Sequence, residues 1–205
     1  MPADEFFWRR AVVAAGAIIY WAGVSVQGRR IRRRIGRSPN LKPRGRRERW
    51  LWAGWTLVVL LWLGQPFLLN GRSDIVGSDI FPAAWQPAGF WFGLALTVVG
   101  YVGTLWCYAA LGSAWRIGID QKEKNPLVTA GPYRWLRHPI YAFQTVMLAG
   151  AALLLPTFWS ATVLLLHLAL VRLKAGDEEA YLQSVHGDAY RDLMARTGRL
   201  FPKFW

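Results

Sequence analysis

The sequence is poor in cysteine, histidine and acidic residues: it has one Cys, three His, and 12 Asp or Glu against 25 Lys or Arg. With Cys107 alone the chain cannot form an internal disulfide, and no group of Cys and His has the spacing of a metal site. A glycine-rich phosphate-binding loop and a nucleophile elbow are also missing. These absences exclude a disulfide-stapled secreted domain, and we expect no bound metal.

Long apolar segments are what the sequence has instead. Hydrophobic residues make up 54% of the 205 residues, and 13 are Trp, which favours the interface between bilayer and water. A helix that crosses ~30 Å of hydrocarbon needs ~20 mostly apolar residues. Uncharged segments near that length lie at 11–27, 50–69 and 88–111, and a longer one at 139–171 contains Pro156, which predicts a bend. We therefore predict an all-α integral membrane protein with about five transmembrane helices, the last two forming a hairpin.

The distribution of charge predicts the orientation in the membrane. Residues 28–49 carry eleven Lys or Arg against Glu48 alone, whereas residues 70–87 carry one Arg against two Asp. Basic loops stay in the cytoplasm. We therefore expect a multi-pass protein of the bacterial inner membrane, with its N-terminus outside and its C-terminus in the cytosol. The net charge of +13 then reflects topology and contact of loop 28–49 with anionic lipid head groups, and not binding of nucleic acid.

The chain reads as a single membrane domain, 1–205. Within it, 1–92 holds the N-terminal helices and the basic cytosolic loop, and 93–205 holds the core. Polar residues able to do chemistry cluster in this core at 127–141 and 172–202, both on the side predicted to be cytosolic. We therefore expect the functional site where these two segments meet.

In the first segment, Gly-Pro at 131–132 predicts a turn, and His138 followed by Pro139 predicts the start of a helix. A residue before proline is pushed away from the α-helical region, and proline suits the first helical position because its missing amide hydrogen is not needed there. We therefore expect free backbone amides at this helix start, beside Arg134 and Arg137, to bind an anion at the membrane surface.

In the second segment, Asp177, Glu178 and Glu179 are expected to open an amphipathic helix, because acidic residues are favourable at the positive helix start. Its apolar stripe has three- and four-residue spacing and consists of Leu182, Val185, Ala189 and Leu193. The stripe predicts a cytosolic helix that lies against the membrane domain. From the residues alone, an interface helix with solvated acids is an equally good interpretation.

Four motifs together resemble the isoprenylcysteine carboxyl methyltransferase family, within the wider group of phospholipid methyltransferases. They are L-V-x-x-G-P-Y-x-x-x-R-H-P-x-Y at 127–141, E-E-x-x-L at 178–182, H-G-x-x-Y at 186–190 and R-L-F-P at 199–202. The similarity extends from about Gly93 to the end of the chain. It implies S-adenosylmethionine as the methyl donor, bound at the cytosolic ends of the last helices, with the C-terminal amphipathic helix capping the cofactor site.

The resemblance and the chemistry of the donor together select the candidate site residues. Cations and amides suit the donor's carboxylate, acids suit its ammonium or ribose, and aromatic rings suit its adenine or sulfonium. The candidate cofactor-binding residues are Gly131, Tyr133, Arg137, His138, Pro139, Tyr141, Glu178 and Glu179. The candidate catalytic residues are Arg137, Arg172 and Glu179, of which the arginines can hold an acceptor carboxylate through two donors.

We predict a membrane methyltransferase that uses S-adenosylmethionine to O-methylate the carboxylate of a lipid-like, isoprenylcysteine-type substrate, which enters from the bilayer. An ionised carboxylate is already nucleophilic, whereas an amine needs a base to remove its proton. Three alternatives stay open. They are a phospholipid amine N-methyltransferase, an NADPH-dependent sterol-type reductase, whose relatives share an Arg-His-Pro-x-Tyr-like element, and a non-enzymatic membrane scaffold.

Overall fold

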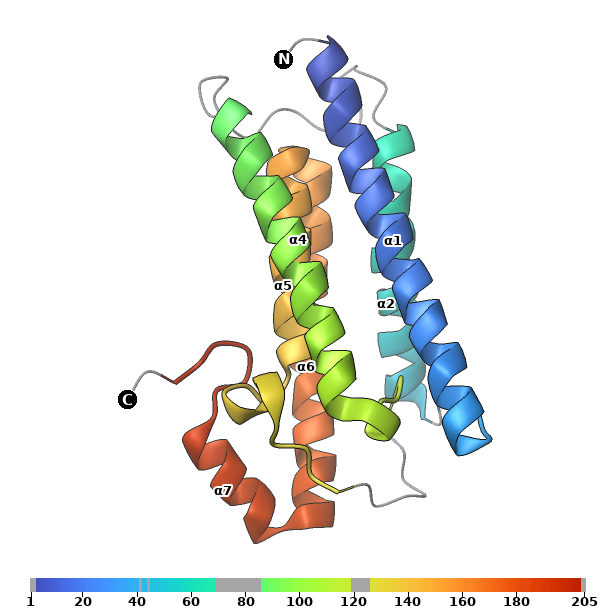
Figure 1. The fold of residues 1–205 in the computed structure, drawn as a ribbon, viewed down its shortest axis with the longest axis vertical. Coiled ribbons are helices and arrows are strands. Elements are labelled where there is room, and N and C mark those ends of the chain that lie inside the picture. The colour runs from blue at the N-terminus through green and yellow to red at the C-terminus, as the bar shows by residue number, and fades with distance from the viewer. Residues whose placement is uncertain (1–2, 41, 44, 69–85, 119–125, 204–205) are drawn as a thin grey trace.

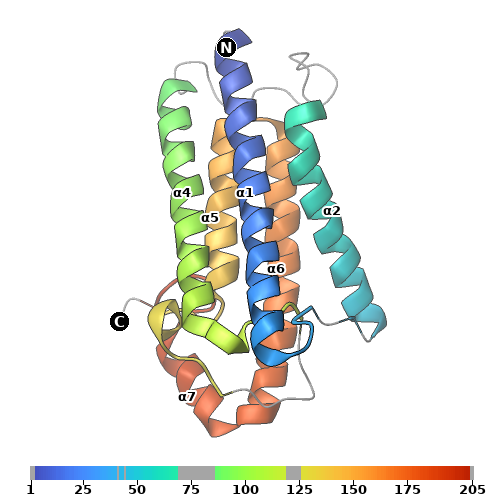
Figure 2. The same ribbon diagram turned by 45° about the vertical axis from the view of Figure 1, so that its right-hand side comes forward.

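The computed structural model describes residues 3–40, 42–43, 45–68, 86–118 and 126–203, and every regular element among them is a helix. The body is a bundle of long helices: α1 (Ala3–Ile35), α2 (Arg46–Leu68), α4 (Gln86–Leu111), α5 (Pro139–Leu154) and α6 (Phe158–His186). Figure 1 and Figure 2 show them running alternately up and down, with the short α7 (Asp188–Arg196) below the bundle. The all-α prediction is therefore confirmed.

Four of these helices, α1, α2, α4 and α6, are long and apolar enough to cross a membrane by length and composition. The fifth, α5, has 16 residues and is shorter than a full span. In the described part of the chain, the predicted five spans thus become four candidate spans and one short apolar helix. The chain turns at Pro156 as predicted, and the Thr157 hydroxyl caps α6 by accepting a 3.2 Å hydrogen bond from the Ser160 amide.

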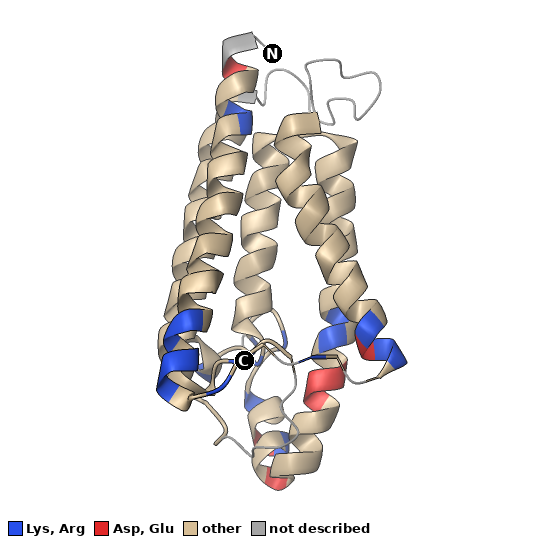
Figure 3. Cartoon of the chain, turned by 90° about the vertical axis from the view of Figure 1, so that its right-hand side faces the viewer, with Lys and Arg blue, Asp and Glu red and all other residues tan. Residues whose placement is uncertain are grey.

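Basic side chains gather at the end of the bundle that carries α7, as the blue segments of Figure 3 show at the lower ends of α1 and α2. The predicted loop at 28–49 is wrong in its first part, because α1 continues to Ile35 and places Arg29–Arg34 on its last turns. Basic residues at a helix C-terminus are favourable for the helix dipole, so the helix extends beyond its apolar part.

The second polar segment also differs from its prediction. Asp177, Glu178 and Glu179 do not open a helix, because they lie inside α6, which runs unbroken to His186. The helix break comes at Gly187, whose φ of +53° is readily adopted only by glycine. The predicted apolar stripe is therefore divided between two helices. On α7, Leu193 is buried, whereas Ala189 is exposed.

Glycines let α4 and α5 approach closely, as small residues do between membrane helices. A β-carbon at Gly100 would lie 2.6 Å from the carbonyl oxygen of Phe143, and one at Gly150 would lie 2.6 Å from that of Gly93. Gly93 and Gly103 of α4 likewise leave no room for a β-carbon beside α5, so the two helices approach closely along this face. This close approach fixes the short α5 against a longer neighbour and so fixes the position of the residues at its first turn.

Candidate functional site

The start of α5 is held by residues 197–199, which we call the C-terminal strap. Leu136 and Gly198 form an isolated parallel bridge. The backbone amides of Arg137 and His138 donate hydrogen bonds to strap carbonyls at 2.9 Å and 3.1 Å. The prediction of free amides for an anion is therefore wrong at these two positions, because the strap already accepts their hydrogen bonds.

Glu179 is buried and binds two arginines beside the strap. Its Oε1 accepts hydrogen bonds from Arg137 Nε at 2.8 Å and Arg199 Nε at 3.1 Å, and Arg199 also donates to its Oε2. Arg137 further donates to the carbonyl of Thr197. A buried ion pair tolerates poorly the loss of one partner, which leaves the other charge uncompensated. Glu179 therefore ties α6, the strap and the start of α5 together.

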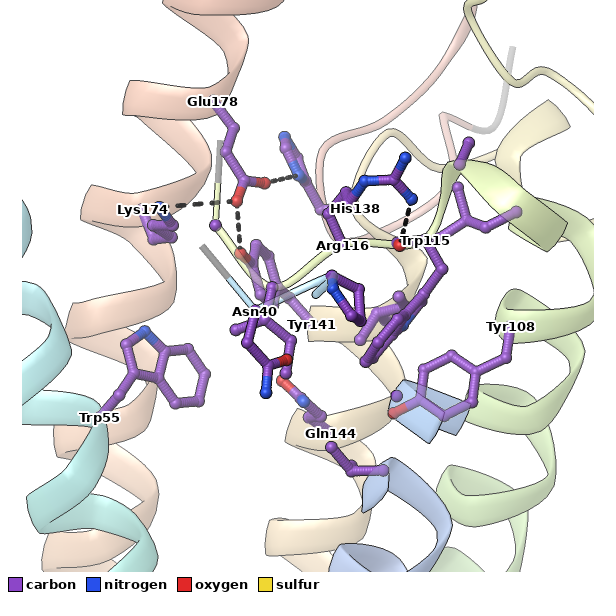
Figure 4. A pocket seen from close by; sticks show the side chains of 18 of the residues that line it. Asn40, Trp55, Tyr108, Trp115, Arg116, His138, Tyr141, Gln144, Lys174 and Glu178 are labelled. Carbon is purple, nitrogen blue, oxygen red and sulfur yellow. Dashed lines mark hydrogen bonds and ion pairs between the residues drawn. The ribbon is translucent and has the colours of Figure 1, made fainter. Parts of the chain in front are cut away.

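Glu178 has different partners, and Figure 4 shows it beside His138, Tyr141 and Lys174. The Tyr141 hydroxyl donates to its Oε1 at 2.8 Å, and Lys174 Nζ lies 3.9 Å from the same oxygen. Its Oε2 lies 3.4 Å from His138 Nδ1. Glu178 is thus held by groups from α5 and α6 while 22% of its side chain stays accessible. The two neighbouring acids are not equivalent.

His138 lies between the two acids. Its Nδ1 is 3.4 Å from Glu178 and its Nε2 is 3.4 Å from Glu179, and its ring stacks on Tyr141 with centroids 5.6 Å apart. Burial alone would lower the pKa of His138, but hydrogen bonding and the negative charge of both carboxylates outweigh it and raise the pKa above its usual value. The two carboxylates therefore stabilise the protonated form of the ring.

A cavity of about 910 Å³ opens beside this junction. It lies within the upper part of the ~300–1,000 Å³ typical of small-molecule sites. Of the predicted site residues, those that line it are Tyr133, Arg137, His138, Tyr141 and Glu178. Burial raises the pKa of Tyr133 well above its usual value, so its phenol stays protonated. The cavity therefore brings the first motif and one acid of the second together.

The other predicted site residues lie outside the cavity wall. Arg172 is exposed on α6, and Glu179 faces the arginines described above. Gly131 has a φ of +58° at the start of the short helix η3 (Gly131–Arg134), and Pro139 is buried at the first position of α5. These two residues shape the backbone around the site without lining it.

The cavity wall also contains residues that sequence reasoning missed. Lys174 faces Glu178 one turn away on α6, and the sequence signal for this pair was a basic residue four positions before an acid. Arg29 and Arg32 line the cavity because α1 is longer than predicted. Deeper in the bundle the wall becomes apolar, with Val58 from α2 and Leu148 from α5. The cavity thus joins a charged end to an apolar interior.

Comparison with known proteins assigns a class to this architecture. Residues 88–189 match the family described as phospholipid methyltransferase. This segment contains α4, α5, α6 and most of the residues that hold Glu178 and His138. Through it the chain belongs to that family of membrane methyltransferases, the wider group that the motifs resemble.

Individual relatives share the same region. The nickel-cobalt-cadmium resistance protein NccN of Alcaligenes xylosoxydans xylosoxydans is 31% identical over 55% of this chain and 53% of its own length. The uncharacterized protein YpbQ of Bacillus subtilis (strain 168) is 32% identical over 38% of this chain and 45% of its own length. The cobalt-zinc-cadmium resistance protein CzcN of Cupriavidus metallidurans is 28% identical over 73% of this chain and 62% of its own length. The matches thus cover roughly half of each relative's own length.

Proposed function

We propose that the chain uses S-adenosylmethionine to O-methylate the carboxylate of a lipid-like, isoprenylcysteine-type acceptor at the cytosolic end of the bundle. The observation that carries this proposal is one cavity in which His138, Tyr141 and Glu178 lie at the charged end of a long apolar wall. Such a cavity suits two ligands at once, a polar donor at the junction and an apolar acceptor that reaches it from the bilayer.

The residues at the charged end fit the donor. Glu178 is a carboxylate with accessible surface, suited to the donor's ammonium or ribose hydroxyls. The Tyr190 hydroxyl is buried in the same wall and has no hydrogen-bond partner among the described residues, which leaves a polar atom for a ligand to satisfy. Tyr133 and Tyr141 offer rings for adenine or for a cation. When bound, S-adenosylmethionine supplies an already activated methyl group.

The charges around the cavity favour a carboxylate acceptor. Among the described residues of the wall, Glu178 is the acid, whereas the bases are Arg29, Arg32, Arg116, Arg137 and Lys174. Arg137 is neutralised by Glu179, but the excess of cations still holds an acceptor carboxylate and keeps it ionised. Such an acceptor needs no general base, so the chain has only to align it and exclude water. We assign Arg172 no contact with the acceptor because it is exposed outside the wall.

The phospholipid amine is the second candidate, and the description of the matched family favours it. An amine acceptor must lose a proton before attack, and the cations of the wall disfavour its protonated form. The two candidates therefore differ in the product and in the pH dependence of the rate.

The test is methyl transfer by the purified protein in lipid nanodiscs, with labelled S-adenosylmethionine and either a farnesylated cysteine or phosphatidylethanolamine. We expect a base-labile methyl ester on the former and no base-stable methylamine on the latter. Glu178→Gln should abolish most of the transfer, while the matched control Asp177→Asn should retain it, because Asp177 pairs with Arg47 away from the cavity. Methylamine formation without ester would overturn the carboxylate assignment.

A further inference from the structure

The apolar interior of the cavity holds a polar pair that the methyl-transfer chemistry does not use. Trp62 of α2 and Gln144 of α5 both line the cavity, and Tyr20 of α1 contacts both of them. Tyr20 and Trp62 have ring centroids 5.7 Å apart, and the Gln144 amide donates to the Tyr20 hydroxyl. Figure 4 shows Gln144 at the inner side of the pocket, beyond Tyr141.

Each member of this pair has one polar atom without a partner. Trp62 is only 4% exposed, yet its indole Nε1 has no hydrogen-bond acceptor among the described residues. The Gln144 Oε1 likewise has no donor. The same wall carries the apolar side chains of Val58, Met147 and Leu148, and Trp21 Nε1 and His167 Nδ1 on it also lack a partner among the described residues. An unsatisfied polar atom in such surroundings is costly, so it usually has a partner.

The same residue types are satisfied where the bundle has no cavity. Trp159 donates its indole N–H to the Leu61 carbonyl at 3.2 Å, and Gln65 accepts from the Ser160 hydroxyl at 2.8 Å. Neither residue lines the cavity. The free donor and the free acceptor are therefore a feature of the cavity wall and not of Trp and Gln in this bundle.

We propose that Trp62 and Gln144 recognise a hydroxyl group within the hydrocarbon part of the lipid acceptor. A hydroxyl fits both free atoms, since it accepts from the indole N–H and donates to the amide oxygen. If the oxygen and nitrogen of the amide are exchanged, the same hydroxyl accepts from the amide instead. This inference rests on the proposed function for the carboxylate end, and it adds that lipid acids with a hydroxyl in the hydrocarbon part bind more tightly than those without one.

Binding can be measured apart from methyl transfer. The probes are a saturated long-chain fatty acid and its analogues with one hydroxyl at successive mid-chain carbons, titrated calorimetrically into the protein in nanodiscs. We expect one position of the hydroxyl to bind about tenfold more tightly than the plain acid, the scale of one or two neutral hydrogen bonds. Trp62→Phe and Gln144→Met should each reduce that preference several-fold while the plain acid binds as before.

The matched control is Trp91→Phe, because Trp91 is 69% exposed on α4 outside the cavity. It should keep the full preference for the hydroxylated acid. Equal binding of plain and hydroxylated acids by the unaltered protein, or a preference that survives in both Trp62→Phe and Gln144→Met, would overturn the inference. Preferential binding without ester formation would overturn the carboxylate methylation and leave hydroxyl recognition standing.

Discussion

The different partners of Glu178 and Glu179 predict that two substitutions of neighbouring acids have different consequences. In Glu179→Gln, the buried Arg137, with 9% of its side chain exposed, loses the carboxylate that compensates its charge. In Glu178→Gln, the Tyr141 hydroxyl keeps an oxygen to which it can donate. The first change therefore affects the folded structure, and the second affects the ligand that Glu178 faces.

The magnitudes follow from burial. Removing one partner of a buried ion pair costs roughly 3–5 kcal/mol, and we expect Glu179→Gln near the lower end because its amide oxygen can still accept one hydrogen bond. Arg199 adds little to this figure, since 40% of its side chain is exposed. For Glu178→Gln we expect about 1 kcal/mol of lost stability but ~1–3 kcal/mol of lost donor affinity, or about 5- to 150-fold in Kd.

Both quantities can be measured on the same purified samples. Denaturant unfolding in detergent gives the free energy of unfolding, and calorimetric titration with S-adenosylmethionine gives Kd. Asp177→Asn is the matched control, since its carboxylate pairs with an exposed arginine on α2. Equal losses of stability in the two variants, or an unchanged Kd in Glu178→Gln, would refute the division of roles between the two acids.

Four further predictions follow from the geometry. Because the pKa of His138 is raised, its contribution to stability is complete below its ordinary pKa of about 6.5 and is lost as the pH rises through the raised value. The difference in unfolding midpoint between wild type and His138→Gln should therefore shrink with rising pH. A difference that grows with pH would contradict it. Gly100→Ala should cost roughly 1–3 kcal/mol in the unfolding assay, because its β-carbon meets the Phe143 carbonyl, whereas Gly176→Ala, with open space around it, should be neutral or stabilising. Cysteines at Ser38 and Ser78 should react oppositely with an impermeant thiol reagent in intact cells, because the excess of basic residues at 28–49 predicts a cytosolic location for that end, and the native Cys107 is buried. The rate of methyl transfer should be flat from about pH 6 to 8 for a carboxylate, and a tenfold rise per pH unit with chemistry rate-limiting would indicate an amine.

The sequence predicts those parts of the fold that local pattern controls. The apolar segments, the turn at Pro156 and the helix start at Pro139 all depend on residues close together in the chain, and the structure has them where they were expected. Motif spacing likewise identified the two segments that meet at the site.

Local sequence pattern does not predict structure that depends on contacts between residues far apart in the chain. The three acids at 177–179 predicted a helix start, but burial of Ala175 and Glu179 against the rest of the bundle keeps α6 continuous. The pairing of the strap with residues 136–138 joins positions about sixty residues apart and has no local signal. That pairing uses the amides that the sequence assigned to an anion.

The polar residues in the apolar part of the cavity wall were the least predictable part of the site. Trp62 and Gln144 sit in apolar helices, where such residues read as interface or packing. Their free polar atoms can be recognised only once α1, α2 and α5 are packed together. The role of Lys174 likewise could not be predicted, because it depends on the pairing with Glu178 in the cavity wall that both residues line.

The most direct test of the central claim is to locate the bound methyl donor. A photoactivatable analogue of S-adenosylmethionine can be crosslinked to the protein in nanodiscs and its adducts mapped by peptide mass spectrometry. The account predicts adducts within residues 133–141 and 178–193, where the cavity wall combines His138, Glu178 and Tyr190, and it predicts that excess unlabelled donor prevents them. Adducts confined to residues outside the cavity, or adducts that excess donor does not reduce, would contradict it.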